Sequence, residues 1–176
     1  GPEGGEPTRV GASIGDITAG MFTAYGVMVA LFHRERTGEG QKVEVGMLDC
    51  QLAVLENAIS RFTTSGAVPK PLGNRHPSIT PFASFTAKDG HIIVGAGNDR
   101  LWVKLCNILG CPELIEDERF NNNGNRTAHV AELHHILDNI FKAKTINEWL
   151  ELLEKAELPC APINTVDKII NDPQIK

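Results

Sequence analysis

The sequence lacks the residue spacings that mark the common metal and nucleotide sites. Its four cysteines form no Cys-x-x-Cys pair and no Cys/His cluster with zinc spacing: Cys50, Cys106, Cys111 and Cys160. No Walker loop, three-glycine dinucleotide motif, Gly-x-Ser-x-Gly, His-Glu-x-x-His or EF-hand pattern is present. Each cysteine lies among apolar neighbours. We therefore expect free, mostly buried thiols in a reducing, cytoplasmic compartment.

Strong charge of one sign and long hydrophobic runs are also missing. The net charge is −5, and acidic and basic residues alternate without a basic stripe, so no nucleic-acid partner is expected. The longest uncharged apolar run, Ile17–Phe32, is shorter than a membrane span, which predicts a buried helix and no membrane contact. The start, Gly1–Arg9, is polar and does not resemble a signal peptide. With 41% hydrophobic and 22% charged residues, the composition is that of an ordinary globular protein.

Hydrophobic periodicity and turn residues predict a mixed α/β protein. Prolines and glycines between residues 63 and 81 exclude a long helix or strand there, so we place a linker at 65–81, between regions 1–64 and 82–176. The last region should be a small α+β domain. Helices are expected at Thr18–Gly38, Met47–Phe62, Asp99–Leu109, 127–142, from Thr145 onward and at Val166–Ile170, and Glu148 three residues after Thr145 completes a capping-box pattern. A hairpin of Phe82–Ala87 and His91–Gly95 is expected around the turn Lys88-Asp89-Gly90, because Asp-Gly between two β-patterned runs is a strong hairpin signal. A short strand is expected at Gln41–Val45 and an extended segment at Pro159–Ile163.

Asp16 is the first candidate for chemistry, because it lies between small residues just before a long apolar-periodic stretch. Such a position is at or near a helix start, where exposed N–H groups and the helix dipole stabilise negative charge. An ionised, accessible carboxylate can attack an activated carbonyl. The local pattern alone favours a simpler role, in which Asp16 or Thr18 only caps the helix.

The remaining candidates also have simple structural alternatives. Gly95–Asn98 follows a strand and precedes a helix, so it could hold a phosphate, but an incomplete glycine motif favours a tight turn. His76 lies in the loop Gly73–Ser78, and loops often carry function, although Asn74 and Ser78 could equally stabilise a turn. The helical spacing of His129, His134 and His135 does not suit a shared metal ion.

Several segments together resemble the class III CoA-transferase family, which includes formyl-CoA transferase, carnitine CoA-transferase and α-methylacyl-CoA racemase. The resemblance covers essentially all 176 residues, and the Arg-Thr-Gly-x-Gly-Gln-x-Val run is its most specific part. The segments are Gly11–Met21, Arg36–Val45, Gly73–Pro77 with Pro81 and Phe82, Phe85–Ala96, and Pro159–Asn164. Among the transferases, the Gly73–His76 loop and the Gly95–Asn98 turn look most like the succinyl-CoA:dicarboxylate branch.

The resemblance implies that Asp16 is a catalytic nucleophile in an acyl-CoA:carboxylate CoA-transferase. In that family the aspartate attacks an acyl-CoA thioester, and the displaced thiolate returns to give an aspartyl-CoA thioester that the acceptor acid then attacks. No metal or redox cofactor is needed, and the substrates are an acyl-CoA and a small carboxylic acid. The family's glycine-containing loop, which closes over the intermediates, corresponds most nearly to Gly73–Ser78. The consecutive glycines of formyl-CoA transferase are missing here. The substrate-binding candidates are Gly73, Asn74, His76, Ser78 and Asn98.

A racemase of the same family is the alternative enzyme. Its acid–base pair is an upstream histidine and the aspartate, helped by a glutamate whose position here is Asn98. An amide cannot relay a proton as a carboxylate does, so Asn98 favours the transferase.

The resemblance also implies an α/β family fold and an interlocked homodimer. In this family an N-terminal nucleotide-fold domain supplies most of the CoA site. Residues 1–64 would then be the end of that large domain with its linker helices. We expect the 176-residue chain alone to bind CoA poorly and to be inactive. A third, non-enzymatic hypothesis is that the chain acts as a folding or dimerisation module.

Overall fold

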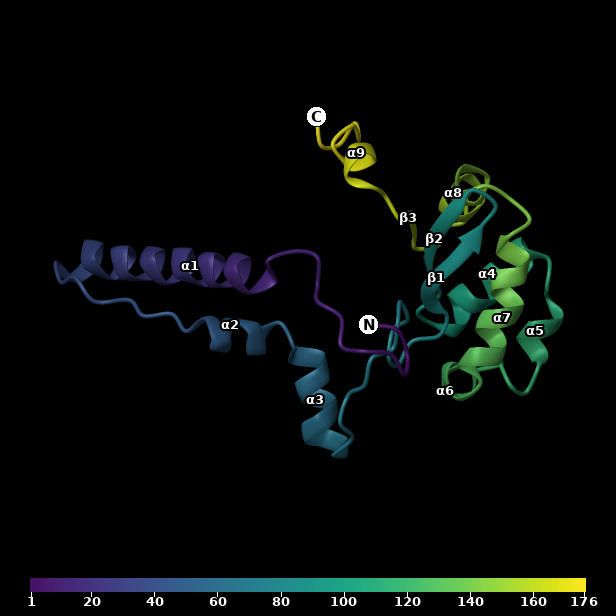
Figure 1. Cartoon of the computed structure of the whole chain (residues 1–176), viewed down its shortest axis with the longest axis horizontal. Coiled ribbons are helices and arrows are strands. Elements are labelled where there is room, and N and C mark those ends of the chain that lie inside the picture. The colour runs from purple at the N-terminus through teal and green to yellow at the C-terminus, as the bar shows by residue number, and fades with distance from the viewer. The chain divides into compact units, whose positions relative to one another are not determined.

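A computed structural model describes all residues, 1–176, and contains nine helices and a three-stranded sheet. The mixed α/β class expected from the sequence is confirmed. The chain comprises two units, Gly1–Pro71 and Leu72–Lys176, and each has its own set of elements (Figure 1). The division between Pro71 and Leu72 falls within the predicted linker, residues 65–81. The predicted ends of the linker itself stay predictions.

The first unit contains α1 (Ile14–Thr37), α2 (Met47–Ala53) and α3 (Glu56–Ser65). Helix α1 ends as expected at Gly38, which has a φ of 79° and donates its N–H to the carbonyl of Arg34. The single helix expected over Met47–Phe62 is wrong, because α2 and α3 are separate. At the break the N–H of Leu55 donates to Leu52, three residues back, which interrupts the α-helical pattern of hydrogen bonds.

The strand expected at Gln41–Val45 is absent, although the sequence alternates there as a strand does. A strand needs a neighbour for its backbone N–H and C=O groups, and no other strand lies within Gly1–Pro71. The segment instead passes close to α1 at Gly26. A β-carbon at that position would lie 2.7 Å from Cγ1 of Val43, so the glycine permits the close approach.

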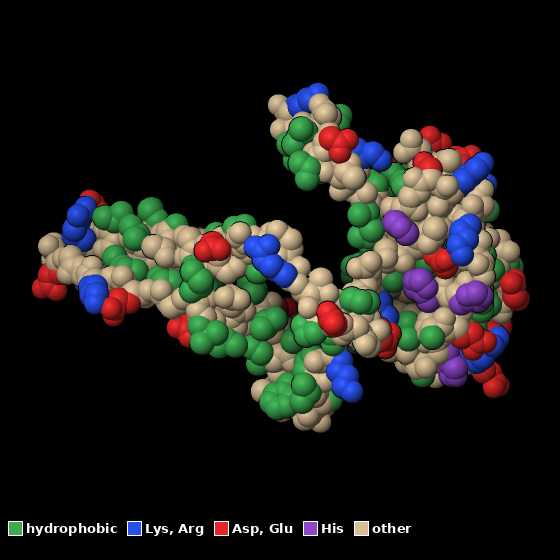
Figure 2. All heavy atoms as spheres, viewed as in Figure 1, with side chains coloured by type: hydrophobic (Ala, Val, Ile, Leu, Met, Phe, Trp, Pro, Cys, Tyr) green, Lys and Arg blue, Asp and Glu red, His purple; other side chains and the backbone are tan.

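The apolar surface of α1 is exposed in this chain, contrary to the buried helix expected from its sequence. Thr18 is its one buried residue, and the space-filling view shows hydrophobic side chains over the surface of this unit (Figure 2). With 24 residues and a mean hydropathy of 1.4 over an 18-residue window, α1 is by length and composition able to cross a membrane, although the uncharged run Ile17–Phe32 within it is shorter than a span. A helix packed inside protein has the same composition, and the absence of membrane contact stays a prediction.

The second unit is built on an antiparallel sheet in the order β1-β2-β3. The predicted hairpin is confirmed, since β1 (Phe82–Ala87) pairs with β2 (Gly90–Gly95) around the turn at Lys88 and Asp89. The extended C-terminal segment is confirmed as β3 (Cys160–Pro162), in which Cys160 lies opposite Val94 of β2.

Six helices complete this unit: α4 (Asp99–Leu109), α5 (Glu113–Glu116), α6 (Asn123–Ala128), α7 (Val130–Phe141), α8 (Ile146–Lys155) and α9 (Val166–Ile169). The sequence predicts one helix over 127–142, but the structure has α6 and α7 joined at His129. Helix α6 begins inside the asparagine run, where the side chain of Asn122 accepts a hydrogen bond from the N–H of Asn125.

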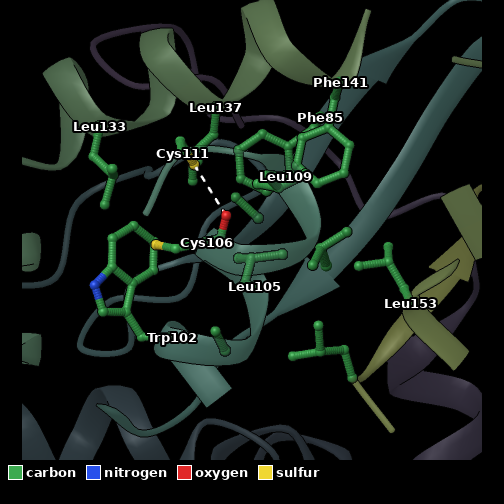
Figure 3. Packing of buried hydrophobic residues seen from close by; sticks show 14 of the residues in the cluster. Phe85, Trp102, Leu105, Cys106, Leu109, Cys111, Leu133, Leu137, Phe141 and Leu153 are labelled. Carbon is green, nitrogen blue, oxygen red and sulfur yellow. Dashed lines mark hydrogen bonds between the residues drawn. The ribbon is translucent and has the colours of Figure 1, made fainter. Parts of the chain in front are cut away.

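The core of the second unit is formed by buried residues of the sheet and of α4, α7 and α8. Helix α7 packs against β1, and α8 packs against β2 and β3 (Figure 1). Phe85 stacks on Phe141 with ring centroids 4.8 Å apart, and Trp149 meets Phe141 edge to face. The fully buried residues labelled in Figure 3 include Leu105, Cys106, Leu133, Leu137, Phe141 and Leu153.

All four cysteines are free, as predicted, and three of them are buried. The Sγ of Cys111 donates to the carbonyl of Cys106 over 3.7 Å (Figure 3). A hydrogen bond with Cys111, together with burial, raises the pKa of the Cys106 thiol, so this sulfur stays protonated and unreactive at neutral pH.

Candidate functional site

Asp16 is the third residue of α1, and it is exposed. The residue at the N-cap position is Ser13, so neither Asp16 nor Thr18 caps the helix, and that alternative is wrong. The hydroxyl of Thr18 instead donates 2.7 Å to the carbonyl of Ile14, inside the first turn. The carboxylate therefore stands alone as the acidic group of this first turn, at the positive end of a 24-residue helix dipole.

The residue before Asp16 is a glycine for a steric reason. A β-carbon at Gly15 would lie 2.9 Å from Nε2 of Gln51, so the missing side chain lets Gln51 of α2 lie against the start of α1. This brings an amide to the neighbourhood of the candidate nucleophile. Gln51 could not be predicted from the sequence, because its contact depends on how α2 packs on α1.

The loop Gly73–Ser78 is ordered around His76. Gly73 has a φ of +65°, which suits glycine, and starts the loop. The backbone N–H of His76 donates 2.8 Å to the carbonyl of Phe82, and the two rings stack with centroids 5.5 Å apart and planes 1° from parallel. The half-buried histidine is thus fixed against the first residue of β1. Gly73, Asn74 and Ser78 are exposed along the same loop.

The hydrogen bonds of His76 assign its neutral tautomer. Its Nδ1 atom accepts from the backbone N–H groups of Ser78, over 3.2 Å, and Ile79, over 3.1 Å. A nitrogen that accepts two N–H groups carries no proton, so the proton of the neutral ring is on Nε2. His76 therefore closes the turn with one nitrogen and keeps an N–H donor on the other.

Asn98 has a structural task, because it caps α4. Its side-chain oxygen accepts a 2.9 Å hydrogen bond from the N–H of Leu101, while its amide N–H₂ donors take no part in the cap. In the preceding turn the N–H groups of Gly95 and Ala96 donate to the carbonyls of Pro159 and Pro81. These two donors are therefore unable to hold a phosphate, and the turn is the tight strand-to-helix connection that the sequence favoured.

A buried arginine links the first residue of α4 to the segment that follows the His76 loop, Gly73–Ser78. Arg126 of α6 is fully buried and donates from Nε to the carbonyl of Thr80 and from Nη2 to the carboxylate of Asp99, each over 2.7 Å. Its Nη1 donates to the carbonyl of Phe120 over 2.9 Å, and its guanidinium lies 5.1 Å from the ring centroid of Trp102. Arg126 was not predicted from the sequence, because an arginine in a polar run usually lies in solvent.

The structure thus brings the loop candidates and Asn98 into one unit, while Asp16 belongs to the other. The three α6–α7 histidines have separate partners, as the helical spacing suggests. His129 bonds the carbonyl of Asn125, His134 bonds that of Ser84, and His135 meets the amide of Asn139.

Comparison with known proteins identifies the family. The model of "CoA-transferase family III" matches residues 1–176. The chain belongs to CoA-transferase family III. The resemblance inferred from the motifs is therefore confirmed, and the relatives include enzymes named as CoA-transferases of dicarboxylic acids.

Two curated relatives and one solved structure show the extent of the similarity. An acetyl-CoA:oxalate CoA-transferase of Acetobacter aceti is 39% identical over 171 residues, which are 97% of this chain and 44% of the relative. A succinate–glutarate CoA-transferase of Agrobacterium fabrum is 36% identical over 98% of this chain and 43% of its own length. A CAIB/BAIF family protein from Brucella suis superimposes with a TM-score of 0.82 at 37% identity, over 99% of this chain and 46% of that chain. The chain thus spans less than half the length of these relatives.

Proposed function

We propose that the full-length protein containing this chain transfers CoA between carboxylic acids, with Asp16 as the nucleophile. The observation that carries the proposal is the place of Asp16, exposed in the first turn of α1 and not engaged as a cap. A carboxylate at this place interacts favourably with the positive end of the helix dipole, and a carboxylate is a nucleophile that can attack a thioester. The names of the CoA-transferase relatives support the same reaction.

The proposed reaction proceeds by two exchanges at Asp16. The carboxylate attacks the thioester carbonyl of the donor, the C–S bond breaks, and a mixed anhydride and CoA thiolate result. The thiolate attacks the aspartyl carbonyl, which releases the donor acid and leaves an aspartyl-CoA thioester. The acceptor carboxylate then displaces the thiolate to form a second anhydride. Finally the thiolate attacks the acceptor's carbonyl, which gives the new acyl-CoA and restores Asp16.

The substrates that fit this chemistry are an acyl-CoA and a small dicarboxylic acid. His76 offers the N–H of Nε2, and Asn98 offers its amide N–H₂, and both are neutral donors suited to a carboxylate. In the same loop, the residues Gly73, Asn74 and Ser78 are exposed to solvent. We assign acceptor binding to these residues. No metal or redox cofactor takes part, because every bond change occurs at acyl carbons and oxygen or sulfur nucleophiles.

We propose that the full-length protein works as an interlocked homodimer in the cytoplasm. The exposed apolar side chains of the first unit support an extensive protein interface, and α1 carries several of the largest, including Phe22, Tyr25 and Phe32. Free cysteines suit a reducing compartment.

Transfer and racemisation are separated by one isotope experiment on the full-length protein. With succinyl-CoA and labelled glutarate, the proposal expects label in a glutaryl-CoA product and no exchange with solvent deuterium at the carbon next to the thioester. The opposite result, deuterium uptake without transfer, would establish racemase chemistry and overturn the proposal. Asn98 argues against that outcome, because its amide replaces the carboxylate that would relay the proton.

A further inference from the structure

Three side chains from one face of α6 hold the end of the His76 loop. The Asn123 amide binds the backbone twice: its Nδ2 donates 2.9 Å to the carbonyl of Ser78, and its Oδ1 accepts 3.0 Å from the N–H of Thr80. Arg126 donates to the carbonyl of Thr80, and the hydroxyl of Thr127 bonds that of Thr80 over 3.1 Å. We call Asn123, Arg126 and Thr127 the α6 clamp.

The spacing of the α6 clamp explains why a helix is present in this polar run. Positions i, i+3 and i+4 share one helix face, so all three side chains point to the same strip of backbone. Asparagine and glycine are poor helix formers, and α6 has only six residues. Its order therefore comes from the Asn122 cap and from its bonds to the loop. The stability of α6 and the conformation of the loop depend on each other.

The α6 clamp binds the same backbone segment, residues 78–80, that orients His76. The carbonyl of Ser78 binds Asn123, while the N–H of the same residue donates to Nδ1 of His76. Ile79, which supplies the second N–H to Nδ1, lies between the two gripped residues. A shift of this segment would remove both donors that keep the proton on Nε2.

We propose that the α6 clamp is a positioning device, which fixes the tautomer and orientation of His76 so that its Nε2–H binds the acceptor carboxylate. The inference rests on the proposed function for the substrate, while its structural part stands on the hydrogen bonds within Leu72–Lys176. Asn123, Arg126 and Thr127 act through the loop and not on the substrate. Preorganised donors lower the cost of ordering the site when the ligand binds.

Asn123→Ala is the test variant, and Asn125→Ala is its matched control. Both remove an asparagine side chain from α6, but Asn125 bonds the carbonyl of Glu118 and the side chain of Asn121, away from the loop. Arg126 is less suitable, because its removal leaves two buried carbonyls without donors and could unfold the chain.

Amide hydrogen exchange tests the structural part directly. In the full-length Asn123→Ala protein we expect the amides of Ser78, Ile79 and Thr80 to exchange about tenfold faster, because each is held in the native hydrogen-bond network. Asn125→Ala should leave these three rates at the wild-type value. Unchanged rates in Asn123→Ala, or equal acceleration in both variants, would overturn the proposal.

Kinetics on the same variants test the role toward the acceptor. We expect Asn123→Ala to raise the KM for the acceptor acid about fivefold, while the yield of aspartyl-CoA adduct from acyl-CoA alone stays at the wild-type value. Asn125→Ala should change neither quantity. An unchanged acceptor KM, or an equal loss of adduct, would overturn the proposal. If the wild-type protein forms no adduct, the proposed function fails, and the exchange rates still decide whether the clamp orders the loop.

Discussion

The Nε atom of Arg126 donates a 2.7 Å hydrogen bond to the carbonyl of Thr80, and the arginine side chain is fully buried. Burying a guanidinium is costly unless each donor has a partner. Here the guanidinium donates to the backbone carbonyls of Thr80 and Phe120 and to the Asp99 carboxylate. It also lies over the face of the Trp102 ring. Asp99 itself is 62% exposed, so one end of the ion pair reaches the solvent.

This arrangement predicts that Arg126→Met destabilises the chain more than Asp99→Asn. The first change leaves two carbonyls of buried residues without donors, and we expect it to lower the free energy of unfolding by about 2–5 kcal/mol. The second keeps the arginine's backbone bonds and should cost about 1 kcal/mol, because solvent reaches Asp99. Urea unfolding followed by circular dichroism measures both. A larger loss for Asp99→Asn would show that the ion pair, not the carbonyls, governs this site.

The capping box of α8 gives a second stability prediction. The N–H of Glu148 donates to the Thr145 hydroxyl, and the carboxylate of Glu148 accepts from the N–H of Thr145, as the sequence predicts. Thr145→Ala should lower the free energy of unfolding by about 1 kcal/mol. Thr165→Ala is the control, because Thr165 precedes α9 without a side-chain bond to the helix backbone. Equal losses in thermal unfolding of the two variants would contradict the assignment.

Acid should weaken the fold in part through Asp117. Its hydrogen bond with the Arg119 side chain lowers the pKa of the Asp117 carboxyl to about 2 from an ordinary 3.8. Because its pKa is lowered in the folded state, the ionised Asp117 carboxylate adds to the free energy of unfolding above the ordinary pKa. This stabilisation is lost as the pH falls from about 4 toward 2. Asp117→Asn should make the unfolding free energy less dependent on pH in that range. An identical pH profile for wild type and variant would contradict the prediction.

The exposed apolar side chains of the first unit predict that the 176-residue chain self-associates. Val29, Met28 and Leu48 are each more than 60% exposed, and many others are similar. Apolar surface on this scale is usually covered by protein in a stable molecule. Sedimentation velocity should therefore show species larger than a monomer at micromolar concentration. A monomer at all concentrations would count against an interface on α1–α3.

Local chemistry predicted the elements that depend on neighbouring residues. Asp89-Gly90 between two apolar runs located the hairpin, and Thr145 with Glu148 located the start of α8. The secondary-structure predictions failed where partners that are distant in the sequence determine the local structure. Gln41–Val45 alternates as a strand but has no strand to pair with, and α6 forms among poor helix residues because its side chains bind Ser78 and Thr80.

The candidate site divides in the same way. Asp16 was singled out from its small neighbours and the apolar helix that follows, although that local pattern favoured a cap. Its role as the nucleophile came from the resemblance and stays a prediction. Arg126, Asn123 and Gln51 were not found, because their importance lies in contacts with residues far away in the sequence. Asn98 was recognised by its position, and its capping bond became visible only in the structure.

The most direct test of the central claim is to trap a covalent adduct on Asp16 in the full-length protein. After incubation with succinyl-CoA and reduction with borohydride, mass spectrometry should find the modification on the peptide that contains Asp16. Asp16→Asn should abolish the adduct and reduce CoA transfer at least about thousandfold. Asp49→Asn, which changes an exposed first-turn aspartate of α2, should leave both unchanged. Modification of another residue, or transfer that persists in Asp16→Asn, would contradict the account.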